Sequence, residues 1–201
     1  MTFETVIRWL AGLLAYTALV IVLYGIWRGT QREAGRTSGR VVDALRSPMF
    51  FLITTVIYVG ICYLFWKPLP VQPSPALKTA FLWLGALLYF PGMGLLVWAR
   101  LALGENYYVS SAVGAQLFAG HHLVTSGPYA MLRHPMYLGL ILAALGSLLI
   151  YLTWTTLFFV LFAPFTLVRA RREEQALSAE FGDDWRAYCR RVPALFPRLR
   201  K

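Results

Sequence analysis

One uncharged run constrains the fold of this chain more than any other feature. Residues Pro135 to Val168 form 34 consecutive positions without Asp, Glu, Lys or Arg. A single helix of that length would extend for about 50 Å, whereas the hydrocarbon core of a bilayer is about 30 Å thick. We therefore predict a helical hairpin that turns near Tyr151 to Thr156. This hairpin would bring the polar stretches His121 to Tyr137 and Arg169 to Pro193 to the same end of the molecule.

The composition is that of an integral membrane protein, because 58% of the residues are hydrophobic and only 14% are charged. Three further apolar runs precede the hairpin, at Val6 to Trp27, Met49 to Trp66 and Leu77 to Trp98. The sequence thus predicts an all-α, polytopic membrane protein. It would have about five transmembrane helices and a cytoplasmic C-terminal helix.

We expect a single membrane domain over residues 1–201. Residues 1–98 would supply three N-terminal spans, and residues 99–201 would supply a polar loop, the hairpin and a cytoplasmic tail. Pro91-Gly92 lies inside the third apolar run and is expected to break or kink that helix. Such a break would either open space for a lipid or let two helices pack closely, and the sequence leaves both alternatives open.

The basic residues indicate the orientation. All but Arg8, Lys67 and Lys78 of the 19 basic residues fall on one side of the predicted membrane. The positive-inside rule then places the N-terminus outside and the polar stretches and the C-terminus in the cytoplasm. Nucleic acid is not the expected partner, because the basic residues follow span ends and form no patch with aromatic residues. Membrane lipids are expected partners of the basic tail.

The sequence Arg133-His134-Pro135 predicts the start of a membrane helix. A residue before proline avoids the helical region, and proline suits the first helical turn. The free amide groups and the positive dipole end of this helix would favour an anionic ligand group. The turn signal Gly127-Pro128 just upstream would bring Tyr129 close to the helix start. The same pattern is also found at ordinary interfacial helix starts.

Glu173 and Glu174 follow directly after a predicted span, among Arg169, Arg171 and Arg172. Carboxylates near the hydrocarbon boundary are costly unless they are paired or liganded, so both are candidates for a functional role. The alternative is an ordinary salt bridge between Arg169 and Glu173, four residues apart on one helix.

Two other sequence features, an apolar stripe and the three histidines, do not by themselves indicate a cofactor or metal site. Leu177, Phe181, Trp185 and Tyr188 recur at three- and four-residue steps, which predicts an amphipathic tail helix whose apolar side chains pack. A metal site is not expected, because the three histidines have no nearby cysteine to complete a ligand set.

Together, the two polar stretches resemble the isoprenylcysteine carboxyl methyltransferase family and, more loosely, the phospholipid N-methyltransferases. The resemblance covers roughly Arg100 to Pro197. The matching residues are His121, Leu123, Val124, Thr125, Ser126, Gly127, Tyr129, Arg133, His134, Pro135, Tyr137, Gly139, Arg169, Glu173, Glu174, Leu177, Phe181, Gly182, Tyr188, Arg191, Val192 and Pro193.

This resemblance implies an enzyme that transfers a methyl group from S-adenosyl-L-methionine to a lipophilic acceptor, such as a prenylated compound. It implies a cofactor site that includes Glu173. The other implied cofactor-binding residues are His121, His122, Leu123, Val124, Tyr129, His134, Pro135, Met136 and Tyr137. It also implies that Arg169 binds the acceptor and that Arg169 and Glu173 are needed for catalysis.

Transfer to a carboxylate requires no proton removal, so positioning and exclusion of water would supply most of the catalysis. We expect Arg169 to position the acceptor carboxylate and Glu173 to fix the cofactor. An amine acceptor, as in a phospholipid N-methyltransferase, would need a base, and Glu174 or His134 could serve.

Two rival readings stay open. The segments from Gly127 to Tyr137 and from Tyr188 to Pro193 also resemble membrane sterol reductases, which use NADPH. Those enzymes generally differ at the positions of Glu173, Glu174 and Leu177. A membrane scaffold or transporter subunit is the third alternative, although the predicted spans contain few of the internal charges that transport usually needs.

Overall fold

The structure, a computed structural model, describes residues 2–30, 48–106 and 122–195. Every regular element within these residues is helical, which confirms the all-α prediction. The helices are α1 (Phe3–Thr30), α3 (Pro48–Leu64), α4 (Pro75–Leu103), α5 (Pro135–Tyr151), α6 (Trp154–Phe162) and α7 (Phe165–Arg191), with short 3₁₀ turns η1 (Gly104–Asn106) and η2 (Gly127–Ala130).

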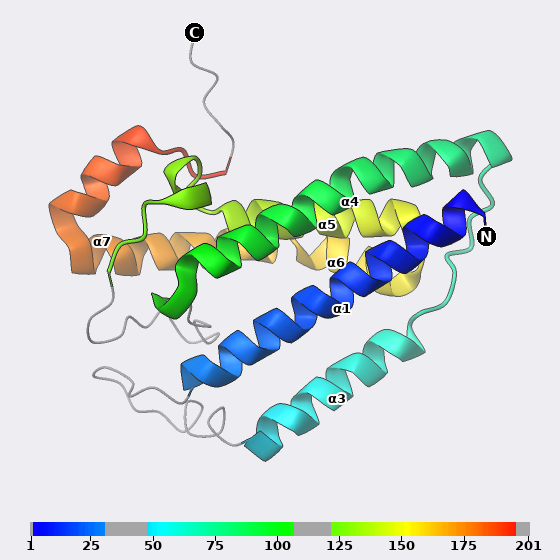
Figure 1. Cartoon of the computed structure of the whole chain (residues 1–201), viewed down its shortest axis with the longest axis horizontal. Coiled ribbons are helices and arrows are strands. Elements are labelled where there is room, and N and C mark those ends of the chain that lie inside the picture. Colours follow the sequence, from blue (N-terminus) through cyan, green and yellow to red (C-terminus); the bar gives the residue numbers. More distant parts are fainter. Residues whose placement is uncertain (1, 31–47, 107–121, 196–201) are drawn as a thin grey trace, which may run out of the picture.

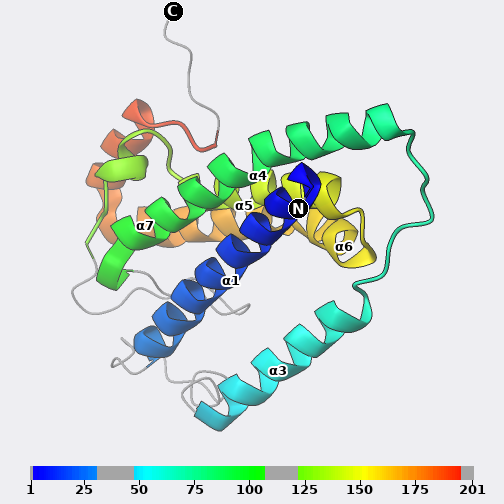
Figure 2. The same ribbon diagram turned by 45° about the vertical axis from the view of Figure 1, so that its right-hand side comes forward.

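Helices α1, α4 and α5 pack together as the centre of the molecule, while α3 lies apart from them (Figures 1 and 2). The C-terminal end of α3 is tied to the start of α6, because the Thr155 hydroxyl donates to the carbonyl oxygen of Cys62 at 2.7 Å. Helix α7 extends to the opposite end of the long axis from the N-terminus (Figure 1). The end of α4, turn η2, the start of α5 and α7 therefore share one end of the molecule.

The uncharged run folds as the predicted hairpin. Helix α5 ends at Tyr151, and Leu152 adopts the left-handed conformation that reverses the chain (φ 49°). Thr153 then caps α6, where its side chain accepts a hydrogen bond from the amide of Thr156. The turn falls inside the predicted window. It is also bonded to the chain before α4, because the amide of Trp154 donates to the carbonyl oxygen of Lys67 at 3.0 Å.

The second arm of the hairpin differs from a single span. Helix α6 ends at Phe162, and Pro164 is the residue before α7, so the apolar run continues into the first turn of α7. Proline lacks an amide hydrogen and its ring obstructs the preceding helical turn, which explains the interruption. The polar residues from Arg169 onward therefore continue a helix that already begins at Phe165.

Helices α4 and α5 approach so closely that their backbones touch. A Cβ atom at Gly146 of α5 would lie 2.5 Å from the backbone nitrogen of Tyr89 in α4. A Cβ at Gly92 of α4 would lie 2.7 Å from the backbone nitrogen of Ala143, and one at Gly139 would lie 2.6 Å from the carbonyl oxygen of Gly92. Small residues allow this kind of close packing between helices in membranes.

The role of Gly92 clarifies the Pro91-Gly92 pair. Helix α4 continues through Pro91, so of the expected break or kink the break does not occur. Gly92 lies against α5, and the pair therefore occurs where the two helices pack closely.

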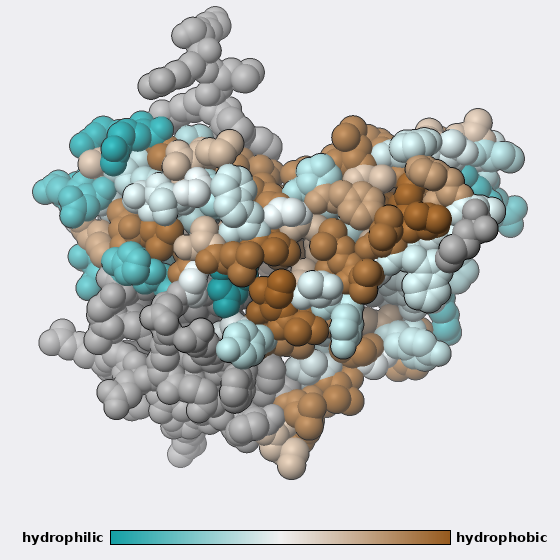
Figure 3. Space-filling model, viewed as in Figure 1, coloured by the Kyte–Doolittle hydropathy of each residue, from teal (hydrophilic) through white to brown (hydrophobic). Residues whose placement is uncertain are grey.

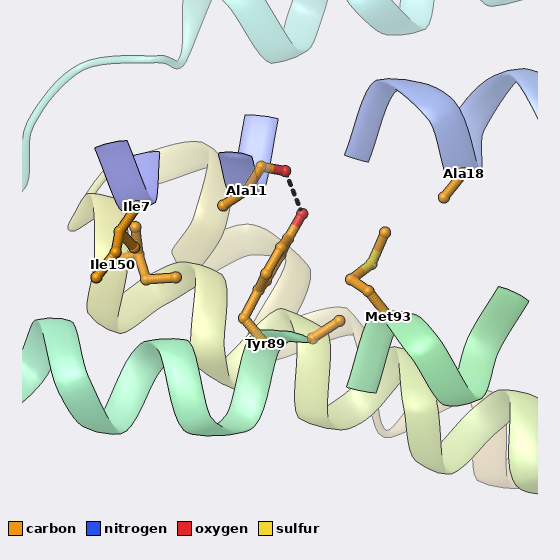
Figure 4. Close-up of a cluster of buried hydrophobic side chains, with 7 residues drawn as sticks. Ile7, Ala11, Ala18, Tyr89, Met93 and Ile150 are labelled. Atoms are coloured by element: carbon orange, nitrogen blue, oxygen red, sulfur yellow. Dashed lines mark hydrogen bonds between the residues drawn. The ribbon is translucent and has the colours of Figure 1, made fainter. Parts of the chain in front are cut away.

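Helix α1 crosses the α4 and α5 pair through a small buried cluster. Ile7 and Ala11 of α1 are buried with Tyr89 of α4 and Ile150 of α5 (Figure 4). The Tyr89 hydroxyl donates to the carbonyl oxygen of Ala11 at 2.8 Å (Figure 4). A buried hydroxyl needs such a partner, so this bond fixes where α1 lies along α4.

Two of the described helical segments, Phe3–Gly25 and Pro75–Leu103, are long and apolar enough to cross a membrane by length and composition. The segments Leu52–Leu64 and Pro135–Tyr151 are apolar but shorter. Hydrophilic residues lie at both ends of the molecule in Figure 3, and hydrophobic residues predominate between them. The number of spans and their orientation stay predictions.

The close helix contact yields a stability prediction. Gly146→Ala should lower the free energy of unfolding by about 1–3 kcal/mol, because its Cβ would collide with backbone atoms that no side-chain rotation can move. Gly94→Ala is the matched control, since no atom lies within 4 Å of a Cβ there and alanine favours the helix. Unfolding in detergent measures both, and equal stability of the two variants would contradict the packing described here.

Candidate active site

The polar end of the molecule is organised around the first turn of α5. His134 precedes the helix and Pro135 is its first residue, as predicted from the sequence. The side chain of His134 does not cap the helix, and the positive end of the helix dipole faces this part of the molecule. His134 and Pro135 are buried, and Met136 beside them is half-buried.

The glutamate pair of α7 meets this helix start, which confirms that the hairpin joins the two polar stretches. Tyr137 donates its hydroxyl hydrogen to Oε1 of Glu173 at 2.5 Å. The Nε2 atom of His134 lies 2.9 Å from Oε1 of Glu174, and the rings of His134 and Tyr137 stack. Four side chains from two distant stretches therefore form two hydrogen-bonded pairs that are joined by ring stacking.

Arg169 lies one helical turn before Glu173. Its Nε atom is 3.4 Å from Oε1 of Glu173, the same oxygen that accepts the bond from Tyr137. The salt bridge expected as the simpler alternative thus forms, and it forms within the group that includes Tyr137. The Arg169 side chain is 41% exposed, so it can still contact a molecule from outside.

Helix α7 bends at Gly182, and the part after the bend packs back over the polar stretch. Gly182 has φ 49° and ψ −113°, a backbone conformation that residues with a Cβ rarely adopt. Beyond it, Trp185 and Tyr188 are buried and pack with Leu123 and Leu177. The packing role predicted for the aromatic stripe is confirmed, and the stripe covers part of the candidate site.

Tyr129 is held by a tight turn on one side and by α7 on the other. Gly127 opens the 3₁₀ turn η2 with φ 60°, a conformation that favours glycine. Tyr129 is buried, and its carbonyl oxygen accepts a 2.7 Å hydrogen bond from the Tyr188 hydroxyl. Burial raises the pKa of Tyr188 to about 12, so this hydroxyl keeps its proton and remains a donor at neutral pH.

The stretch from His121 to Val124 is only partly described. His121 lies outside the described residues. His122 is exposed and pairs with Asn106 at the end of η1, with 2.9 Å between its Nε2 and the amide nitrogen of Asn106. Leu123 and Val124 are half-buried. The structure thus links this stretch to the end of α4 through Asn106 and to α7 through Leu123.

Sequence reasoning missed two contacts of the site. It treated Arg133 only as a flanking residue, whereas its Nη1 atom lies 3.1 Å from Oε1 of Glu174. It did not consider Asn106, which pairs with His122. Arg133 lies within the predicted Arg-His-Pro signature, so its position was a signal, but nothing in the sequence named its partner.

The arrangement suits a ligand that carries both a negative and a positive charge. The helix start favours an anionic group, whereas Glu173 favours a cationic one. Among residues 2–30, 48–106 and 122–195, no three His, Cys, Asp or Glu side chains are grouped so that they could hold a metal ion. The chemistry that these residues support is binding and orientation of charged groups at an apolar boundary.

Comparison with known proteins adds an independent line of argument. Residues 80–184 match the model of the family described as phospholipid methyltransferase. The chain is 32% identical over 167 residues to a protein-S-isoprenylcysteine O-methyltransferase of Schizosaccharomyces pombe, and the match covers 82% of this chain and 61% of that protein. It is 30% identical over 172 residues to methanethiol S-methyltransferase 2 of Bradyrhizobium diazoefficiens, covering 78% of this chain and 61% of that one.

A shorter match reaches a different class of enzyme. Over 77 residues the chain is 43% identical to a delta(14)-sterol reductase of Mus musculus, which covers 37% of this chain and 18% of that protein. The chain spans about three fifths of the length of the two methyltransferases that it matches.

The contact between Glu174 and His134 yields a pH prediction. The hydrogen bond from His134 holds the pKa of Glu174 below its ordinary value of 4.5, and the charge of Arg133 adds to this effect. A carboxyl with a lowered folded-state pKa stabilises the fold above its ordinary pKa, and that contribution is lost as the pH falls through the lowered value. The free energy of unfolding should therefore decrease below pH 4.5, and less steeply in Glu174→Gln.

Unfolding in detergent across this pH range measures the difference. Glu180→Gln removes an exposed carboxylate from the same helix and serves as the control. If Glu174→Gln and the wild type lost stability in parallel, the contact with His134 would not be the source of the effect.

Proposed function

Because the chain belongs to the phospholipid methyltransferase family, we propose that it is an integral membrane methyltransferase. It transfers a methyl group from S-adenosyl-L-methionine to a lipophilic acceptor, and the proposed acceptor group is the carboxylate of an isoprenylcysteine-like compound. The resemblance drawn from the two polar stretches is confirmed at the level of the family, by the family model and by the methyltransferase relatives.

The observation that carries the proposal is the meeting of α5 and α7. Tyr137 and Glu173, which the resemblance assigns to one cofactor site, are 36 positions apart in the chain, yet they share a hydrogen bond, and His134 contacts Glu174 beside Glu173. A packing role alone does not need two carboxylates at an apolar boundary, where their desolvation is costly. A site for a cofactor with a cationic group gives Glu173 a partner of opposite charge.

We assign the cofactor to the surface between the start of α5 and Glu173. When bound, S-adenosylmethionine supplies a methyl group activated by a sulfonium charge. The positive dipole end at the start of α5 favours a carboxylate, while Glu173 favours an amino or sulfonium group. Tyr137 orients Glu173 by donating to its Oε1 atom. Tyr129 and the stretch from His121 to Val124 complete the proposed cofactor site.

Arg169 is the proposed acceptor-binding residue. It lies one turn from the apolar part of α7, so its guanidinium can bind a carboxylate while an attached lipid chain stays in the hydrophobic region. Its link to Glu173 sets the distance between the acceptor and the cofactor. Positioning of this kind is the main contribution required, because a carboxylate acceptor has no proton to lose.

The contacts of Glu174 favour a carboxylate over an amine acceptor. An amine would need a base, and Glu174 was one candidate. Its Oε1 atom is already bonded to His134 and Arg133, and its pKa is lowered, so it is a weak proton acceptor. Of the two possible bases for an N-methyltransferase, Glu174 therefore has little support, and His134 is left as the other candidate.

The membrane assignment and its orientation are part of the proposal. The two long apolar helical segments and the apolar middle of the surface in Figure 3 support membrane insertion. The distribution of basic residues favours an external N-terminus and a cytoplasmic active site. The sterol reductase alternative rests on a match to 37% of the chain and lacks the longer similarity that both methyltransferases have.

An assay of labelled methyl transfer tests the proposal. Purified protein should transfer the methyl group of S-adenosylmethionine to N-acetyl-S-farnesylcysteine, and alkali should release the label as methanol, because a methyl ester is hydrolysed there. Arg169→Gln should slow transfer on the order of 100-fold through loss of positioning. Arg171→Gln removes an exposed arginine from the same helix and should retain the wild-type rate.

Alkali-stable label in phosphatidylethanolamine or in a thiol would reassign the acceptor within the same reaction class. Oxidation of NADPH without any methyl transfer would replace the proposed function by a reductase.

A further inference from the structure

Arg133 lies beside the start of α5 and connects several separate parts of the site. Its Nη1 atom lies 3.1 Å from Oε1 of Glu174 and donates a 2.8 Å hydrogen bond to the sulfur of Cys189. Its guanidinium carbon lies 5.9 Å from the centre of the Trp185 ring. The side chain is only 17% exposed, so these contacts are formed largely out of water.

The partners of Arg133 lie on both sides of the bend in α7. Glu174 precedes Gly182, whereas Trp185 and Cys189 follow it. Gly182 permits the bend through its positive φ, but no atom lies within 4 Å of a Cβ there, so the bend is not packed against other residues at this point. The guanidinium joins the two parts of α7 by polar contacts, beside the apolar contact of Leu177 with Trp185 and Tyr188.

The backbone of the same segment is held as well. The amide of Arg133 donates to the carbonyl oxygen of Pro193 at 2.8 Å, and the amide of His134 donates to that of Ala194 at 3.0 Å. The chain after α7 thus pairs with the residues just before α5. The helix start is fixed to the tail through both side-chain and main-chain bonds.

These contacts connect directly to the proposed cofactor residues. Arg133 and His134 contact the same oxygen of Glu174. His134 stacks on Tyr137, which in turn bonds to Glu173. A displacement of Arg133 would therefore move the His134 ring and the Tyr137 hydroxyl that orient the cofactor-binding carboxylate.

We propose that Arg133 is a positioning residue for methyl transfer, which clamps the two parts of α7 across the Gly182 bend and thereby fixes His134 and Tyr137 against Glu173. This inference rests on the proposed function. Arg133 acts on the cofactor side of the site and leaves acceptor binding to Arg169.

Three variants test the clamp: Arg133→Gln, Glu174→Gln and the control Arg186→Gln. Arg186 also lies in α7 and pairs with Asp183, but that pair is exposed to solvent and outside the clamp. Affinity for S-adenosylhomocysteine, the rate of methyl transfer and KM for the acceptor are measured at a temperature where every variant is folded. Hydrogen exchange of residues 183–192 is followed in the same samples.

The clamp predicts a split between the kinetic constants. Arg133→Gln should weaken cofactor affinity and slow transfer roughly 10- to 100-fold through misplacement, with little change in KM for the acceptor. Exchange in residues 183–192 should accelerate about tenfold, since a buried hydrogen bond from a charged group is lost. Glu174→Gln should change both readouts in the same direction, whereas Arg186→Gln should match the wild type.

Faster exchange with unchanged cofactor affinity and rate would reduce Arg133 to a purely structural residue and overturn the proposal. Exchange at the wild-type rate in Arg133→Gln would remove the clamp itself. If the wild-type protein neither binds S-adenosylhomocysteine nor transfers methyl groups, the proposed function fails. Hydrogen exchange would then still decide whether Arg133 joins the two parts of α7.

Discussion

The backbone contact between α4 and α5 determines where the rest of the site can form. Gly92 lies against Gly139, and Gly146 lies against Tyr89, so the two helices approach without intervening side chains. This contact fixes the start of α5 beside the end of α4, where the turn at Gly127 packs against Trp98. Tyr137 and the helix start therefore belong to a closely packed pair of helices, which suits a site that works by positioning.

The hairpin then brings α7 to the same end of the molecule, where its two glutamates meet partners. Two adjacent carboxylates near an apolar boundary would be costly alone, yet each has partners of suitable chemistry. Glu173 accepts bonds from Tyr137 and Arg169, and Glu174 contacts His134 and Arg133. The two glutamates thus have different roles. Glu173 contacts Arg169, the proposed acceptor-binding residue, while Glu174 holds the start of α5 against α7.

The sequence predicted the hairpin and the start of α5 because both follow from local chemistry. An uncharged run too long for one span must turn, and proline suits only the first turn of a helix. The partners of Arg133 and of Asn106 were not predictable, because a single sequence does not show which distant side chains meet. The short length of α6 was not predictable from hydropathy either. Hydropathy does not register that Pro164 lacks an amide hydrogen, which interrupts the helical hydrogen bonds after α6.

A double-mutant cycle on S-adenosylmethionine affinity tests the central claim, that α5 and α7 together form one cofactor site. Isothermal titration would compare the wild type with Tyr137→Phe, Glu173→Gln and the double variant in detergent. Because Tyr137 orients Glu173, both single variants should bind S-adenosylmethionine more weakly. The loss of binding free energy in the double variant should differ from the sum of the two single losses by about 0.5–3 kcal/mol. Unchanged affinity in Glu173→Gln, or losses that simply add, would contradict a shared site.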